Sequence, residues 1–166
     1  MDGAYLHLLV NHFPIVLGVV GAAAALLALV ARRRTPWLYA VATLTIAGAT
    51  AYPVMLTGHA AEDASRDQWY VARETVHAHE EASDVATYVL IAMGIASAVA
   101  WWRLARGRDL LTPPPWLQAL VVLTALAGAG SVTWASYQGG KIVHKSERLA
   151  TPPAGWVKPT EPPGEH

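Results

Sequence analysis

Histidines are the residues of this chain best suited to chemistry, because it has seven of them and no cysteine. Neutral imidazole is a ligand for haem iron, copper and zinc. The lack of cysteine excludes disulfides, iron–sulfur clusters and covalently attached c-type haem. Six histidines are candidate cofactor ligands: His7, His12, His59, His77, His79 and His144. The seventh, His166, is the last residue and is assigned no role.

Two of these histidines lie in the apolar stretch Tyr5–Ile15, beside an asparagine and a proline. Polar ligands at the mouth of a membrane helix are costly to keep there, so they indicate a functional site. Five residues turn a helix by about 140°, so the rings of His7 and His12 should point apart. The face of His12 holds Tyr5, Leu8, Val16 and Val19. The face of His7 holds Asn11, Pro14, Gly18 and Gly21. The spacing therefore indicates two sites, or one ligand and one supporting residue.

The composition is that of a membrane protein. It is 54% hydrophobic and 14% charged, whereas roughly 25% of an ordinary soluble domain is charged. Four apolar segments reach the length of about 20 residues that a helix needs to cross a bilayer. They cover about residues 4–31, 37–57, 79–105 and 116–137. The sequence therefore predicts an all-α membrane protein, with a single four-helix transmembrane bundle in residues 1–149 and a proline-rich tail in 150–166.

Arginines in two short connections predict the orientation of the bundle. Arg32, Arg33 and Arg34 follow the first segment, and Arg103, Arg106 and Arg108 follow the third. Short loops rich in arginine stay in the cytoplasm. Both termini and the tail are then expected outside, an N-out and C-out topology. All six candidate histidines gather at this outer end.

Small residues predict where the helices touch, because helices in lipid associate through close packing rather than through a hydrophobic drive. Each segment has at least one glycine suited to this: Gly18 and Gly21, then Gly48, then Gly94, and finally Gly128 and Gly130. We interpret these glycines as points of close helix packing. An alternative is that some of them leave room for a flat cofactor.

Helical periodicity also predicts which way His79 faces. If the third helix begins before it, His79 shares a stripe with Val76, Ser83, Ala86 and Leu90, which would face the interior. His77 instead aligns with Glu81 and Asp84 on a wetter face. We predict His12 and His79 as the axial ligands of a haem iron. The other candidates, His7, His59, His77 and His144, would serve a second haem or support the first.

Haem suits this arrangement because helix bundles commonly hold b-type haem by two inward histidines, and porphyrin needs apolar walls. Two alternatives stay open. One is a copper, zinc or iron site without porphyrin, to which Glu80, Glu81 and Asp84 would add carboxylates. The other is a cofactor-free accessory subunit of a membrane complex. The sequence has no nucleophile triad, phosphate loop or dinucleotide fingerprint. We therefore favour an electron-transfer subunit over a stand-alone enzyme.

Four motifs resemble a family of small bacterial membrane proteins with four helices, known as domain of unknown function 2231. They are HLLVNHFPIVL from His7, TGHAAED from Thr57, HEEASDVATYVL from His79 and GGKIVHKSERL from Gly139. Together they span about residues 5–149, although Leu8 stands where the family often has proline. The resemblance implies a four-helix bundle in the bacterial inner membrane and supplies no activity.

Together these observations predict a b-type haem protein, with one or two haems, that transfers electrons or belongs to a redox complex. Its partners would be the lipid bilayer, an extracytoplasmic redox protein or a quinol, and further copies or other subunits. The formal net charge is zero, so no nucleic-acid partner is expected.

Overall fold

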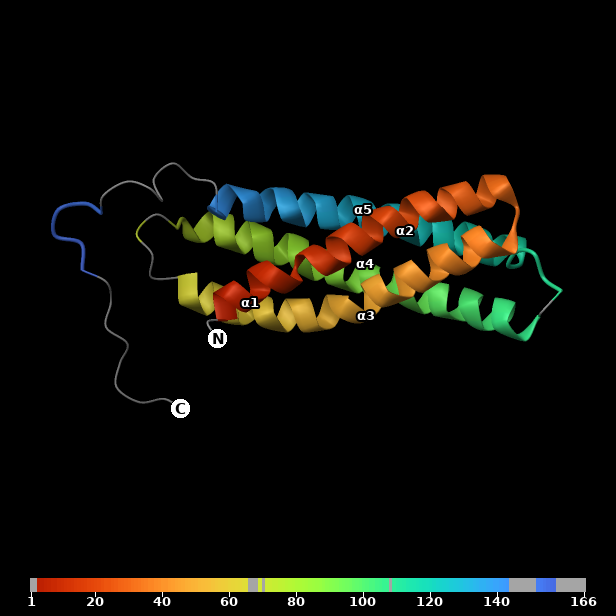
Figure 1. The fold of residues 1–166 in the computed structure, drawn as a ribbon. Helices are drawn as coiled ribbons and strands as arrows, with labels where there is room; N and C mark the ends of the chain where they lie inside the picture. Colours follow the sequence, from red (N-terminus) through yellow and green to blue (C-terminus); the bar gives the residue numbers. More distant parts are fainter. Residues whose placement is uncertain (1–2, 66–68, 70, 108, 144–151, 158–166) are drawn as a thin grey trace.

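The computed structural model describes residues 3–65, 69, 71–107, 109–143 and 152–157, and every regular element in these ranges is an α-helix. The helices are α1 (Gly3–Val10), α2 (His12–Ala31), α3 (Arg34–Ser65), α4 (Arg73–Arg106) and α5 (Pro115–Val143). A turn at Asn11 separates α1 from α2, which together form one span (Figure 1). The described chain contains four helical spans long and apolar enough to cross a membrane. The predicted all-α, four-helix membrane architecture is therefore confirmed.

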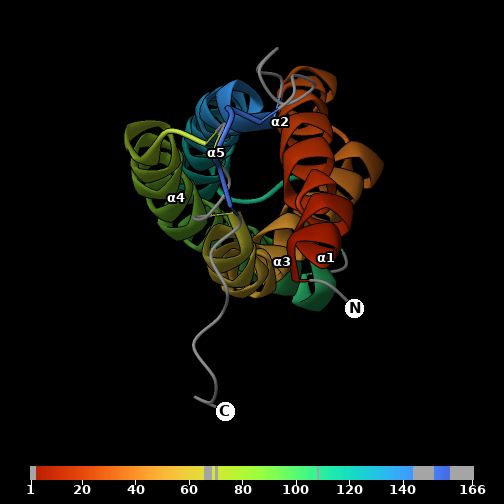
Figure 2. The same cartoon turned by 90° about the vertical axis from the view of Figure 1, so that its left-hand side faces the viewer.

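The four spans surround a common interior (Figure 2). Helix α2 packs against α3 and α5, α4 packs against α3 and α5, and the short α1 lies mainly against α3. We call the end where α1 and α4 begin and α3 and α5 finish the histidine end. The opposite end, which holds the α2–α3 and α4–α5 connections, is the arginine end (Figure 1). The first and last described helices thus begin and end on the same side, as the sequence predicts.

Two helices extend well past the apolar segments that predict them. Helix α3 continues beyond Thr57 to Ser65, and α4 already begins at Arg73. Hydropathy detects only the part of a helix that crosses the bilayer core, which is about 30 Å thick, whereas helices of this length reach roughly 50 Å. Ala60, Ala61 and Glu62 are good helix formers, so α3 persists where its apolarity ends. His59, His77 and His79 consequently lie on helices rather than in loops.

Glycines set the closest approaches between helices, as expected. A Cβ atom at Gly48 would lie 2.6 Å from the Gly94 Cα, so α3 and α4 touch backbone to backbone there. A Cβ atom at Gly21 would lie 2.6 Å from a Leu44 side-chain carbon. Gly130 is different, because it is exposed and a Cβ atom there would meet nothing within 4 Å. The predicted packing role of Gly130 is wrong, because this glycine lies on the outer face of α5.

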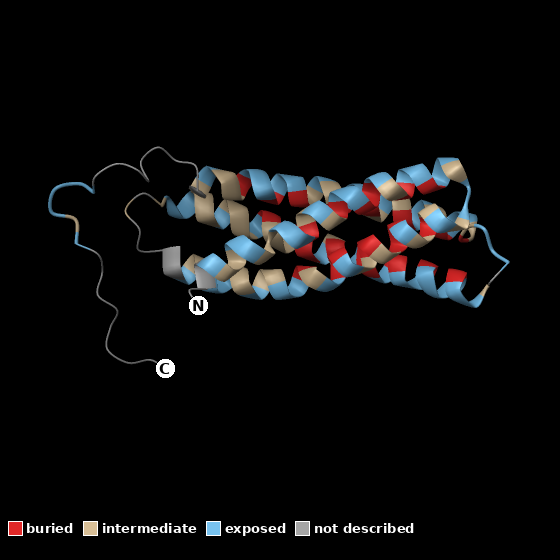
Figure 3. Cartoon of the chain, in the orientation of Figure 1, coloured by how far each residue is buried: buried red, intermediate tan, exposed pale blue. Residues whose placement is uncertain are grey.

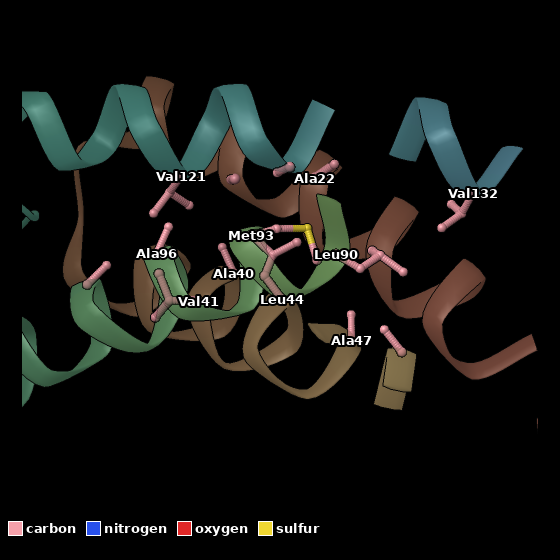
Figure 4. Packing of buried hydrophobic residues seen from close by; sticks show 14 of the residues in the cluster. Ala22, Ala40, Val41, Leu44, Ala47, Leu90, Met93, Ala96, Val121 and Val132 are labelled. Atoms are coloured by element: carbon pink, nitrogen blue, oxygen red, sulfur yellow. The ribbon is translucent and has the colours of Figure 1, made fainter. Parts of the chain in front are cut away.

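The core lies in the middle of the bundle and toward the arginine end, where buried positions are densest (Figure 3). Leu44, Met93 and Val121 bring side chains from α3, α4 and α5 into one cluster (Figure 4). The same cluster includes Trp37 and Leu104, both of which are fully buried. This packing holds the spans in one register from which the histidine end projects.

Arg34 closes the arginine end. Its Nη2 atom donates a hydrogen bond to the Leu104 carbonyl at 2.7 Å. Its Nη1 atom donates to the Gly107 and Leu110 carbonyls, both at 3.0 Å. The last carbonyls of a helix have no partner within that helix. An arginine at the start of α3 therefore ties down the end of α4.

Candidate cofactor site at the histidine end

His7 on α1 is anchored to α3. Its Nδ1 atom lies 3.1 Å from the Thr57 hydroxyl oxygen. That hydroxyl donates its only proton to the Val54 carbonyl, at 2.8 Å. The Thr57 oxygen can therefore only accept from His7, which assigns the proton of the neutral ring to Nδ1. The Nε2 atom of His7 is left with a free lone pair.

His79 on α4 is anchored to α5 in the same manner. Its Nδ1 atom lies 3.0 Å from the Ala135 carbonyl oxygen, which can only accept a hydrogen bond. The Ser83 hydroxyl makes a longer contact of 3.5 Å to the same nitrogen. The Nδ1 atom of neutral His79 is thus protonated, and its Nε2 atom also has a free lone pair. Such a hydrogen bond at one ring nitrogen orients a histidine that binds metal through the other.

A glycine accommodates each ring. A Cβ atom at Gly58 would lie 3.3 Å from the Cε1 atom of His7. A Cβ atom at Gly139 would lie 2.9 Å from the Cε1 atom of His79. Gly58 follows Thr57, and Gly139 lies one turn beyond Ala135. The glycine that makes room for each ring therefore lies close to the residue that anchors it.

One ring is held by the α1–α3 pair and the other by the α4–α5 pair, and these pairs lie on different sides of the interior (Figure 2). Both rings are half-buried, and the charges they carry when protonated would interact across the interior. Asn11, one helical turn after His7, has a buried side-chain oxygen without a hydrogen-bond partner. Gln138 on α5 is also buried, and its amide oxygen accepts a hydrogen bond from Lys141. The interior at this end is therefore polar and contains unused bonding capacity.

Three other candidate histidines face outward and do not join this site. His12 is exposed, and its Nδ1 atom lies 3.0 Å from the carbonyl oxygen of Leu8, four residues earlier in the chain. His59 is exposed on α3. His77 is exposed and lies 3.6 Å from Glu80 and 3.3 Å from Glu81. His144 lies outside the described residues.

Periodicity correctly predicts the facing of His79 and His77, and it correctly separates the faces of His7 and His12. His79 lies inward and His77 outward, as the stripes on α4 indicate. His7 follows Pro14, Gly18 and Gly21 into the interior, while His12 stays on the exposed face. The structure therefore does not bring the predicted ligands His12 and His79 together, because His12 is exposed, and His7 is the half-buried histidine of the first span instead. The physical reason is that the small-residue face of this span is the one that packs.

Thr57, Gly58, Ala135 and Gly139 were not predicted as site residues. Thr57-Gly58 and Gly139-Gly140 did appear among the motifs of the family resemblance, which was their only signal. Ala135 contributes through its backbone, which no side-chain pattern reveals.

Among the described residues no group of three or more histidine, cysteine, aspartate or glutamate side chains is placed to hold a metal ion. The candidate site therefore consists of two half-buried imidazoles at the same end of the bundle, each with an anchored Nδ1 and a free Nε2. Comparisons with protein-family models, curated proteins and solved structures find no match to this chain. The resemblance to the four-helix family stays a prediction.

Proposed function

We propose that this multi-pass membrane protein binds a b-type haem through His7 and His79 and passes electrons at the histidine end of the bundle. The observation that carries the proposal is the shared state of the two rings. Each neutral imidazole donates from Nδ1 to a neighbouring helix and keeps the lone pair of Nε2 available. A haem iron takes two such nitrogens as axial ligands, and it supplies one-electron chemistry when bound.

Haem matches this ligand set better than a bare metal ion. Structural zinc takes four protein ligands, and catalytic zinc takes three. The described residues offer two half-buried histidines at this end and no group of three candidate ligands. Porphyrin supplies the other four nitrogens itself, so two histidines suffice. The free Asn11 side-chain oxygen is suited to a polar group or a water molecule beside such a cofactor.

The proposed ligand pair is His7 and His79. His12 also has a free Nε2, but its ring is exposed. His79 keeps the role that the sequence predicts for it. His12 would then lie on the surface that meets lipid or another subunit.

The height of the site along the bundle supports electron exchange at a membrane surface. Counting about 20 residues back from Arg32 reaches His12, and the same count from Arg103 reaches Ser83. His7 and His79 lie just beyond these positions, at the level where hydrocarbon gives way to headgroups. With the arginine connections in the cytoplasm, this is the outer face of a bacterial inner membrane. There the haem could exchange electrons with an extracytoplasmic redox protein, and with a quinol dissolved in the bilayer.

The test is the optical spectrum of protein purified in detergent and titrated with haem. The wild type should show a Soret band and a reduced spectrum typical of two histidine ligands. His7→Ala and His79→Ala should each abolish that low-spin spectrum, whereas His12→Ala, the matched control on the same span, should keep it. A protein that binds no haem on reconstitution would refute the proposal. Metal analysis of the same sample detects a non-haem centre.

A second experiment tests whether the hydrogen bond from His7 to Thr57 contributes to haem affinity. Thr57→Val keeps the side-chain volume but removes the oxygen that accepts the His7 proton. Loss of such an outer hydrogen bond typically weakens metal binding 10–100-fold. Thr45→Val is the control, because the Thr45 hydroxyl bonds only within its own helix, to the Val41 carbonyl. Equal haem affinity in the two variants would contradict the proposed orientation of His7.

A further inference from the structure

An apolar groove lies between α2 and α5, away from the histidines. It has a volume of about 380 Å³. Its lining is almost wholly apolar: Leu29, Pro115, Gln118, Ala119, Val122 and Leu123. The Gln118 amide nitrogen already donates to the Pro113 carbonyl at 2.7 Å, so the one polar lining side chain is partly satisfied. The groove therefore offers shape and apolar surface rather than polar recognition.

Positive charge lies at the arginine end of this groove. Leu29 on α2 is followed one turn later by Arg32 and Arg33, both exposed. Arg32 has a left-handed backbone, with φ of 51°, and its N–H group donates to the Ala28 carbonyl, so α2 ends there. The two guanidinium groups therefore extend from the end of the helix that forms one wall.

The opposite wall begins with a helix N-terminus. Pro115, which lines the groove, is the first residue of α5. The positive end of that helix dipole favours an anion nearby. Trp116, the next residue, is 58% exposed, and exposed tryptophans mark the headgroup level of a bilayer. The apolar groove thus lies, at headgroup level, beside the end of α2 that two arginines follow and beside the positive end of α5.

We propose that this groove binds an anionic phospholipid, with an acyl chain along Leu29, Ala119 and Val122 and the phosphate group near Arg32 and Arg33. Charge complementarity selects this occupant over a neutral lipid. The site is independent of the histidine end, so it holds whether or not the protein binds haem. The bound phospholipid would connect the α2–α3 loop with the first turn of α5.

The experiment measures lipid binding to the purified full chain in detergent, by native mass spectrometry with a parallel thermal shift. The probes are phosphatidylglycerol and phosphatidylcholine with identical acyl chains. Wild type should bind phosphatidylglycerol more tightly. Arg32→Gln together with Arg33→Gln should lower that affinity about 25-fold, because each arginine near an anionic lipid contributes about fivefold, and should lower phosphatidylcholine binding far less, because its choline group balances the phosphate charge. Ala119→Leu, at an exposed position, should weaken both lipids by filling the groove.

The control is Arg106→Gln, which removes a guanidinium stacked 4.5 Å from the Trp102 ring centre on α4. It should leave the phosphatidylglycerol affinity within twofold of wild type. An equal loss in that variant, or equal wild-type affinity for the two lipids, would overturn the proposal. Competition by millimolar inorganic phosphate would assign the arginines to free phosphate instead. A change of oligomeric mass in Ala119→Leu without a change in lipid affinity would assign the groove to a second copy of the chain.

Discussion

The two ends of the bundle use polar side chains in opposite ways. At the arginine end, Arg34 donates to three carbonyls at and beyond the end of α4. At the histidine end, His7 and His79 each use one ring nitrogen to reach a neighbouring helix and leave the other free. The same kind of bond between helices thus completes the structure at one end and leaves bonding capacity at the other. A fold needs only the first, so the second supports the proposal that a ligand binds at the histidine end.

Side chains are also packed more densely at the arginine end than at the histidine end. Trp37 and Leu104 are fully buried toward the arginine end, whereas both interior histidines are only half-buried. Dense packing stabilises one arrangement and leaves no room for a ligand. Stability should therefore depend on the arginine end and ligand binding on the histidine end.

The largest expected effect is on stability, from Trp37→Ala. This change removes a fully buried indole and should lower the free energy of unfolding by about 3 kcal/mol. His7→Ala should cost only about 1 kcal/mol, the contribution of one partly buried hydrogen bond. The measurement is unfolding in mixed detergent micelles followed by circular dichroism.

Trp37→Phe is the matched control for this comparison. The Trp37 indole nitrogen has no hydrogen-bond partner, so losing it should add little to the cost of the smaller ring. If His7→Ala were as damaging as Trp37→Ala, the two ends would not differ in the way proposed.

A smaller effect is expected for Arg34→Gln. The variant leaves carbonyls of Leu104, Gly107 and Leu110 without their charged donor. Hydrogen bonds from charged groups contribute more than neutral ones, but this site is partly exposed, so we expect a loss of about 2 kcal/mol. The readout is amide hydrogen exchange, which should accelerate in the last turn of α4 and stay unchanged around His79. Faster exchange at both ends alike would show that Arg34 supports the whole bundle rather than its own end.

The sequence predicts much of this contrast. Hydropathy gives the four spans, and periodicity gives the facing of His79 and His77. It does not reveal that α3 runs on to Ser65, because helix propensity outlasts apolarity there. Nor does it single out Arg34 from its neighbours Arg32 and Arg33. Which arginine turns back to α4 depends on the distance between two helices that are far apart in the chain.

The choice of the two proposed haem ligands, His7 and His79, also goes beyond what the sequence can predict. Residue types and spacing identify six histidines and separate the faces of His7 and His12. Choosing between those two requires knowing which face of the first span packs. That depends on close contacts such as Gly21 against Leu44, and sequence periodicity alone does not rank them.

The smallest expected effect on stability separates two glycines of α5. Gly139→Ala and Gly130→Ala make the same chemical change, and each should gain up to about 1 kcal/mol of helix propensity. At Gly130 nothing lies within 4 Å, so the gain should appear in full. At Gly139 the new methyl group would lie 2.9 Å from the His79 ring, and the ring must move away from the Ala135 carbonyl. We expect the gain to be cancelled and the Nδ1–H signal of His79 to shift in nitrogen-15 NMR spectra. Equal stability gains with an unshifted His79 signal would mean that Gly139 does not position this ring.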